Sequence, residues 1–131
     1  MFIDVVRSRK SCRLFTDVPL EKNEMELIIE AGRKAPSSRN LKDVRLFPVT
    51  DLGLIRRLAL CKDGSTTPLE TATFAVIVAA DPDVCDVWIE DASIATIMMQ
   101  LEAEDIGIGS CWIQIRLRSS GETPAEDFVK R

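Results

Sequence analysis

The sequence lacks two side chains on which enzymes often rely for acid and base chemistry. Among its 131 residues there is no histidine and no tyrosine. The missing histidine excludes Ser-His-Asp and Cys-His nucleophile activation and the HExxH zinc motif, and the missing tyrosine excludes a phenol as general acid. Redox or hydride-transfer chemistry would therefore need a borrowed cofactor.

Long apolar runs and an excess of basic residues are also missing. The longest apolar run spans residues 74–80, far short of the roughly 20 residues that a membrane helix needs. The N-terminus does not have the layout of a signal peptide. The net charge of −4 argues against nucleic-acid binding, although a local basic cluster at residues 7–13 leaves that alternative open. We therefore expect neither a membrane nor a nucleic-acid partner.

Cysteines are few and none is paired as CxxC, which argues against a zinc finger or a thioredoxin-like motif. With no export signal, we interpret the four cysteines as free thiols of a cytoplasmic protein, packed as small hydrophobes. The apolar share of 46% and the charged share of 29% are typical of a globular chain. The length predicts a single domain over residues 1–131.

Apolar periodicity predicts helices over residues 2–8, 21–34 and 86–106, and another after Asp51. Strands are expected at 44–50, at 73–80 as a central strand buried on both faces, and at 110–115.

Thr123, Pro124 and Glu126 predict a helix start with Thr123 as N-cap. Because that helix meets the end of the sequence after about two turns, we expect a fragment of a longer chain. The alternative is a short, frayed helix.

The helix expected at 86–106 carries an apolar stripe of Ile94, Ile97, Met98 and Leu101. Asp91 and Glu102 could act as an acid and base pair, but they lie three turns apart on one helix. We therefore interpret them as a solvated or dimer-facing surface.

Three short clusters could carry chemistry. Residues 9–13 hold three cations and a serine, which suit a phosphate, although a solvated basic patch is the alternative. Residues 36–40 form a loop rich in hydrogen-bond donors that suits a flat polar ring or a sugar-like chain, although a plain loop that ends a helix is the alternative. Residues 107–114 hold a Gly-x-Gly that follows a helix and precedes a strand. That order is the reverse of the Rossmann fingerprint, so a packed helix end is the alternative.

Taken in this order, the clusters resemble the nitroreductase family of FMN-dependent oxidoreductases. Residues 9–15, Arg-Lys-Ser-Cys-Arg-Leu-Phe, match the family's Arg-Arg-Ser-x-Arg-x-Phe, and residues 35–41, Ala-Pro-Ser-Ser-Arg-Asn-Leu, match its Ala-Pro-Ser-x-x-Asn. Residues 107–113, Gly-Ile-Gly-Ser-Cys-Trp-Ile, match its Gly-x-Gly-[Thr/Ser]-Cys-Trp-Ile after the long helix. The likeness covers about residues 3–117.

The resemblance implies an α+β fold with a mixed, mostly antiparallel sheet flanked by helices. It implies a homodimer with two FMN molecules at the subunit interface and the 86–106 helix as a main interface element. Arg9, Ser11 and Arg13 would hold the FMN phosphate and ribityl chain, with Lys10 adding main chain or charge. The flavin ring would be lined by Pro36, Ser37, Ser38 and Asn40, from the other subunit, and by the backbone near Gln114.

The implied activity is a ping-pong reaction in which NAD(P)H reduces FMN and the flavin then reduces a small-molecule acceptor: a nitroaromatic, a quinone or an activated alkene. No dedicated catalytic side chain and no metal is implied. The sequence departs from the family at Lys42, Asp43 and Val44, where the motif has Gln-Pro-Trp, and in a shortened 59–73 segment. The alternative function is a non-catalytic flavin- or nucleotide-binding module, or a flavin-free structural dimer.

Overall fold

The computed structural model describes residues 1–130. In chain order, the elements are α1 (Phe2–Ser8), α2 (Lys22–Arg33), the 3₁₀ turn η1 (Ser38–Asn40), β1 (Val44–Val49), α3 (Leu52–Leu58), α4 (Pro68–Thr71), β2 (Ala75–Ala80), α5 (Trp88–Asp105), β3 (Ser119–Ser120), β4 (Thr123–Pro124) and α6 (Ala125–Lys130). No helix within residues 1–130 is both long and apolar enough to cross a membrane.

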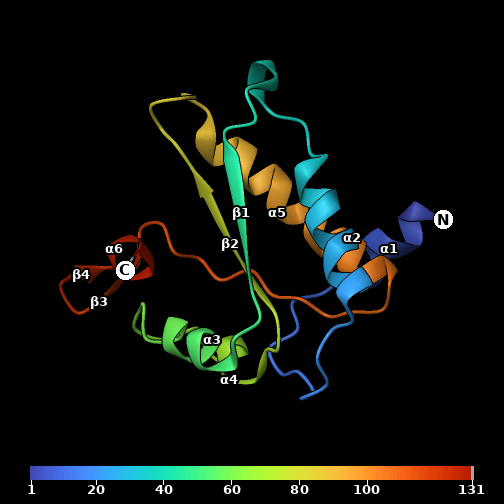
Figure 1. Ribbon diagram of the computed structural model, residues 1–131, viewed down its shortest axis with the longest axis horizontal. Helices are drawn as coiled ribbons and strands as arrows, with labels where there is room; N and C mark the ends of the chain where they lie inside the picture. Colours follow the sequence, from blue (N-terminus) through green and yellow to red (C-terminus); the bar gives the residue numbers. More distant parts are fainter. Residues whose placement is uncertain (131) are drawn as a thin grey trace.

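Two antiparallel strands cross the middle of the molecule (Figure 1). In β1 and β2, Val44 lies opposite Ala80 and Val49 opposite Ala75. A second antiparallel pair, β3 with β4, forms a short hairpin before α6. One isolated parallel bridge joins Ser11 to Ser110. The β-structure is therefore mixed and mostly antiparallel, as the family resemblance implied.

One side of the β1–β2 pair is covered by α2 and α5, which pack against each other (Figure 1). The α2 residues Ile28 and Ile29 and the α5 residues Met99 and Ala103 form the buried centre of this layer. Alternate strand residues face them, among them Leu46, Val76 and Val78. Gly32 lets the two helices and β1 approach, because a Cβ there would lie 2.7 Å from Leu46 Cδ1.

The opposite side of the pair is covered by α3 and α4. Val49, Ile55 and Leu69 form a second buried cluster, against which Ala75, Ile77 and Ile113 pack. The Asp51 carboxylate caps α3 by accepting the Leu54 N–H at 2.9 Å, as expected from the sequence. The sheet is thus packed on both faces, and the two termini lie at opposite ends of the molecule (Figure 1).

Three sequence-based element predictions are wrong. Residues 110–115 form no strand beyond the single bridge at Ser110, since their extended backbone has no continuous partner in residues 1–130. β2 contacts both clusters, yet it pairs with β1 alone and is only half-buried, so it is not a central strand. The helix expected after Thr123 does form, as α6, but Thr123 and Pro124 pair with β3 in the hairpin, so only the predicted cap is wrong and the helix begins at Ala125 in place of Pro124.

The long helix α5 buries a different face from the one that its apolar stripe suggests. Asp91, Ala95, Met99 and Ala103 face the core, while Ile94, Ile97 and Met98 are more than a third exposed. The helix ends in a Schellman motif, in which the Ile108 N–H bonds to the Ala103 carbonyl and Gly107 adopts a φ of +82°. In the single chain, α5 therefore has an exposed apolar face formed by Ile94, Ile97 and Met98.

Candidate functional site

The basic N-terminal segment lies beside the Gly-x-Gly segment, although about 100 residues of sequence separate them. Cys12 donates its N–H to the Ser110 carbonyl at 2.8 Å, and a parallel bridge joins Ser11 to Ser110. Gly109 is needed at this contact, because a Cβ there would lie 2.8 Å from Cys12 Sγ. Two of the three motifs are thus brought together by backbone pairing.

A small basic pocket opens where these two segments meet. It has a volume of about 280 Å³ and is lined by Arg13, Lys62, Ser65, Thr67, Pro68, Cys111, Trp112, Gln114 and Arg118. Three of these side chains are cations and none is acidic. Guanidinium forks and an ammonium group bind phosphate and other anions well. We call this cavity the basic pocket.

Lys62 is a notable member of the basic pocket because only 8% of it is exposed. Gln114 is held in place from both ends of its amide: the oxygen accepts the Trp112 indole N–H at 3.0 Å, and the nitrogen donates to the Arg116 carbonyl at 2.9 Å. The pocket thus presents fixed polar groups alongside its positive charge.

The loop after α2 has a backbone that most residues avoid. Arg39, Asn40 and Lys42 all have positive φ values, between 50° and 56°. The Ser37 hydroxyl accepts the Lys42 N–H at 3.1 Å, and the Asp91 carboxylate accepts the Ser38 N–H at 3.1 Å. Left-handed residues other than glycine are strained and are often found at functional sites, where surrounding contacts hold them. This loop therefore remains a strong candidate for a binding segment.

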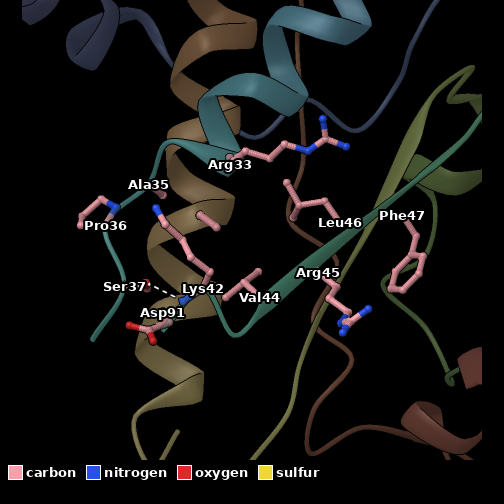
Figure 2. A pocket seen from close by; sticks show the side chains of 12 residues that line it. Arg33, Ala35, Pro36, Ser37, Lys42, Val44, Arg45, Leu46, Phe47 and Asp91 are labelled. Atoms are coloured by element: carbon pink, nitrogen blue, oxygen red, sulfur yellow. Dashed lines mark hydrogen bonds between the residues drawn. The ribbon is translucent and has the colours of Figure 1, made fainter. Parts of the chain in front are cut away.

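A larger cleft lies between this loop, the start of β1 and α5, as Figure 2 shows. It has a volume of about 430 Å³. Its lining includes Pro36, Ser37 and Lys42 from the loop and Asp91 from α5. We call this cavity the loop cleft.

The residues singled out from the sequence are divided between the two cavities. Arg13 and Gln114 line the basic pocket, whereas Pro36 and Ser37 line the loop cleft. No residue lines both cavities. The remaining candidates line neither of them: Arg9, Lys10, Ser11, Ser38 and Asn40. Neither of these two cavities within residues 1–130 therefore gathers all three motifs.

The interpretation of Asp91 as a solvated or dimer-facing acid is wrong. Only 3% of Asp91 is exposed, and its carboxylate holds the Ser38 N–H. Sequence reasoning also missed Lys62 and Arg118, which line the basic pocket. Each is a lone basic residue beside a loop, and in the sequence it cannot be distinguished from an ordinary surface charge. The structure shows that the two side chains lie in the same pocket, because distant segments fold together there.

Comparison with known proteins places this architecture in one family. The family model described as "Nitroreductase family" matches residues 6–128. This chain belongs to the nitroreductase family. The match confirms the relationship that the three motifs indicated.

Solved nitroreductase structures share the fold. An FMN-dependent nitroreductase from Clostridium difficile R20291 superposes with a TM-score of 0.95 at 37% identity, over 98% of this chain and 75% of that one. A structure from Parabacteroides distasonis superposes at 0.88 with 26% identity, over 99% of this chain and 77% of that one. These superpositions confirm the predicted α+β nitroreductase fold.

A curated relative from Archaeoglobus fulgidus carries the name "Putative NADH dehydrogenase/NAD(P)H nitroreductase". It is 29% identical over 133 aligned positions, which cover 98% of this chain and 71% of the relative. The similarity therefore extends over nearly all of this chain and beyond the three motifs.

Proposed function

We propose that this nitroreductase is an FMN-dependent oxidoreductase that takes reducing equivalents from NAD(P)H and delivers them to a nitroaromatic, a quinone or an activated alkene. Bound FMN supplies the hydride chemistry, which explains why a chain with neither histidine nor tyrosine can be a redox enzyme. The observation that carries the proposal is the basic pocket, which forms where two family motifs meet.

The residues of the basic pocket fit FMN in charge and in donor type. The phosphate needs cationic forks, which Arg13 and Arg118 offer, and the polar edge of the flavin ring needs donors, which Lys62 and Gln114 offer. We assign Arg9 and Ser11 to further contacts with the phosphate and the ribityl chain of FMN. Lys10 would contribute a main-chain contact or its positive charge at the same place. The buried Lys62 would also stabilise negative charge on the ring.

The cofactor site would be completed by a second copy of the chain. The basic pocket, at about 280 Å³, falls below the usual range of ligand sites, roughly 300–1,000 Å³. The family resemblance assigns Pro36, Ser37, Ser38 and Asn40 to the flavin site of the other subunit. Their separation from Arg13 within one chain supports that assignment. The exposed apolar residues Ile94, Ile97 and Met98 of α5 would form part of the homodimer interface.

Titration of FMN into the cofactor-free protein tests the assignment of Arg13. Arg13→Ala should weaken FMN binding by about 1.5–3 kcal/mol, roughly ten- to hundredfold, as for one charge-assisted contact. Arg57→Ala is the matched control, because Arg57 is exposed and lines neither cavity. Equal affinities for the two variants would contradict the phosphate assignment.

The same titration separates the two functional alternatives when consumption of NADH and NADPH is followed in parallel. Tight FMN binding without consumption of either nucleotide would favour the non-catalytic flavin-binding module. Absence of FMN binding would favour the flavin-free dimer. The proposed enzyme requires both FMN binding and consumption of one nucleotide in the presence of an acceptor.

A further inference from the structure

Three buried side chains with metal-ligating atoms meet beside the loop cleft. Asp43 precedes β1, Cys85 lies in the turn after β2, and Asp91 lies in the first turn of α5. Their exposed fractions are 6%, 2% and 3%. One ligand atom from each lies within 4.8 Å of the other two. Asp43 and the segment 85–91, which are distant in sequence, thus converge on one point.

The Asp43 carboxylate lies beside the carboxyl group of Asp91 and has no N–H or cationic partner within residues 1–130. Both of its oxygens are buried and accept no hydrogen bond within residues 1–130. No lysine or arginine of that range forms an ion pair with either Asp43 or Asp91. Two adjacent buried carboxyl groups need either a shared proton or a bound cation to offset their charge.

The spacing of the cluster suits a tetrahedral zinc ion. The Cys85 thiol donates a hydrogen bond to Asp91 Oδ2, with 3.6 Å between the sulfur and the oxygen. Zinc bond lengths of about 2.3 Å to sulfur and about 2.1 Å to oxygen place two such ligands about 3.6 Å apart. One oxygen of the Asp43 carboxylate also lies within 4.8 Å of both groups.

Asp91 is also oriented as a metal ligand usually is. Its two oxygens share the Ser38 N–H at 3.1 and 3.2 Å, and Oδ2 also accepts the Cys85 thiol, so the carboxylate is held between the loop and Cys85. Asp91 lines the loop cleft as well, so the cluster adjoins an open cavity (Figure 2).

We propose that Asp43, Cys85 and Asp91 form a binding site for one divalent transition-metal ion of the zinc class. A sulfur ligand selects zinc over magnesium and calcium, which prefer oxygen alone. Binding would release the Cys85 thiol proton to solvent and leave a thiolate on the ion. Three protein ligands leave the fourth position for water. The ion would link three parts of the fold: the start of β1, the turn before α5 and the end of the 37–42 loop.

The test uses the chain after removal of metals with EDTA. Zn²⁺ binding is measured by equilibrium dialysis and elemental analysis, and Co²⁺ serves as a spectroscopic probe, since a cysteine ligand gives a thiolate-to-cobalt charge-transfer band. We expect one Zn²⁺ per chain. Asp43→Asn should weaken Zn²⁺ binding at least about tenfold. Mutation of a residue that only supports a metal ligand already costs about tenfold or more in metal affinity, so loss of a ligand should cost no less. Cys85→Ser should abolish the charge-transfer band.

Two matched controls are Asp83→Asn and Cys111→Ser. Asp83 is an exposed acid two residues from Cys85, and Cys111 is a half-buried thiol outside the cluster. Both controls should bind Zn²⁺ like the parent. Circular dichroism checks that each variant folds. Should Asp43→Asn fail to fold, Cys85→Ser and the cobalt spectrum still decide the question.

Two outcomes would overturn the proposal. One is a parent chain that binds no Zn²⁺, in which case Asp43 and Asp91 share a proton instead. The other is Zn²⁺ bound equally by the parent, Asp43→Asn and Cys85→Ser, which indicates adventitious surface binding. Metal content is read without FMN or NAD(P)H, so this result is independent of the proposed redox activity.

Discussion

The Asp91 carboxylate accepts the backbone N–H of Ser38 at 3.1 Å, across 53 residues of sequence. This bond anchors a loop with three left-handed residues to the first turn of α5. The helix α5 therefore has two roles besides packing in the core. It holds the loop on one side and exposes an apolar stripe on another.

Replacing Asp91 with asparagine should loosen the loop. Hydrogen bonds to charged acceptors are worth about 1.5–3 kcal/mol, against about 1 kcal/mol for neutral ones. We therefore expect amide exchange in residues 36–42 to speed up about tenfold, as measured by hydrogen exchange and mass spectrometry. Glu90→Gln, at an exposed neighbour, is the control. Unchanged exchange in Asp91→Asn would show that other contacts hold the loop.

Adding a methyl group at Gly32 should destabilise the main core. An alanine Cβ would lie 2.7 Å from Leu46 Cδ1 and 2.8 Å from Met99 Cγ. Overpacking costs about 1–3 kcal/mol, which exceeds the gain in helix propensity of about 1 kcal/mol at most. Urea unfolding should show this loss for Gly32→Ala. Gly53→Ala should stay within about 1 kcal/mol of the parent, because its Cβ meets only Asp51 Oδ1, at 3.2 Å.

A charge in the exposed stripe of α5 should break the proposed homodimer. Ile97 is 37% exposed in the single chain, and a glutamate there would be buried without a partner at the interface. Ile97→Glu should cost at least about 2 kcal/mol of dimer stability, as for an interface hot spot. Analytical ultracentrifugation measures this, with Leu52→Glu on α3 as the control. A dimer that persists in Ile97→Glu would place the interface elsewhere.

Stability should fall at alkaline pH through Cys61. Burial raises the pKa of this fully buried thiol, and the nearby Lys62 offsets the rise only in part. A group with a higher pKa in the folded chain stabilises it below the unfolded pKa, here about 8.5. That stabilisation is lost as pH rises through the folded pKa. The unfolding free energy should therefore decline above about pH 8.5.

Comparison of pH profiles isolates the contribution of Cys61. In urea unfolding from pH 7 upwards, Cys61→Ala should show a shallower decline than the parent, whatever its absolute stability. Cys111→Ser should keep the parent slope, and no tyrosine titrates in this range. Identical slopes for the parent and Cys61→Ala would rule out Cys61 as the cause.

Local signals in the sequence were enough for much of the fold. The α2 face of Ile28, Ile29 and Gly32 follows from helical spacing, and the Asp51 cap follows from residue type and position. The strand expected at 110–115 could not be judged in this way, because a short apolar run does not reveal whether a partner strand exists. The predictions of a single domain, a cytoplasmic location and a homodimer stay predictions.

The candidate site could be predicted only in part, because its parts are separated in sequence. Arg13 and Gln114 were found through the family motifs and do line the basic pocket. Lys62 could not be found, since its burial depends on segments that fold over it. The burial of Asp91 depends in the same way on the distant Ser38 loop. Tertiary contacts, which leave no local pattern, decide such positions.

The most direct test of the proposed redox activity is a visible absorption spectrum of the FMN-loaded protein under anaerobic conditions. Addition of NADH or NADPH should bleach the flavin bands, and a quinone or nitroaromatic added afterwards should restore them. Failure to retain FMN, or flavin bands that neither nucleotide bleaches, would contradict the assignment of this nitroreductase as an NAD(P)H-dependent oxidoreductase.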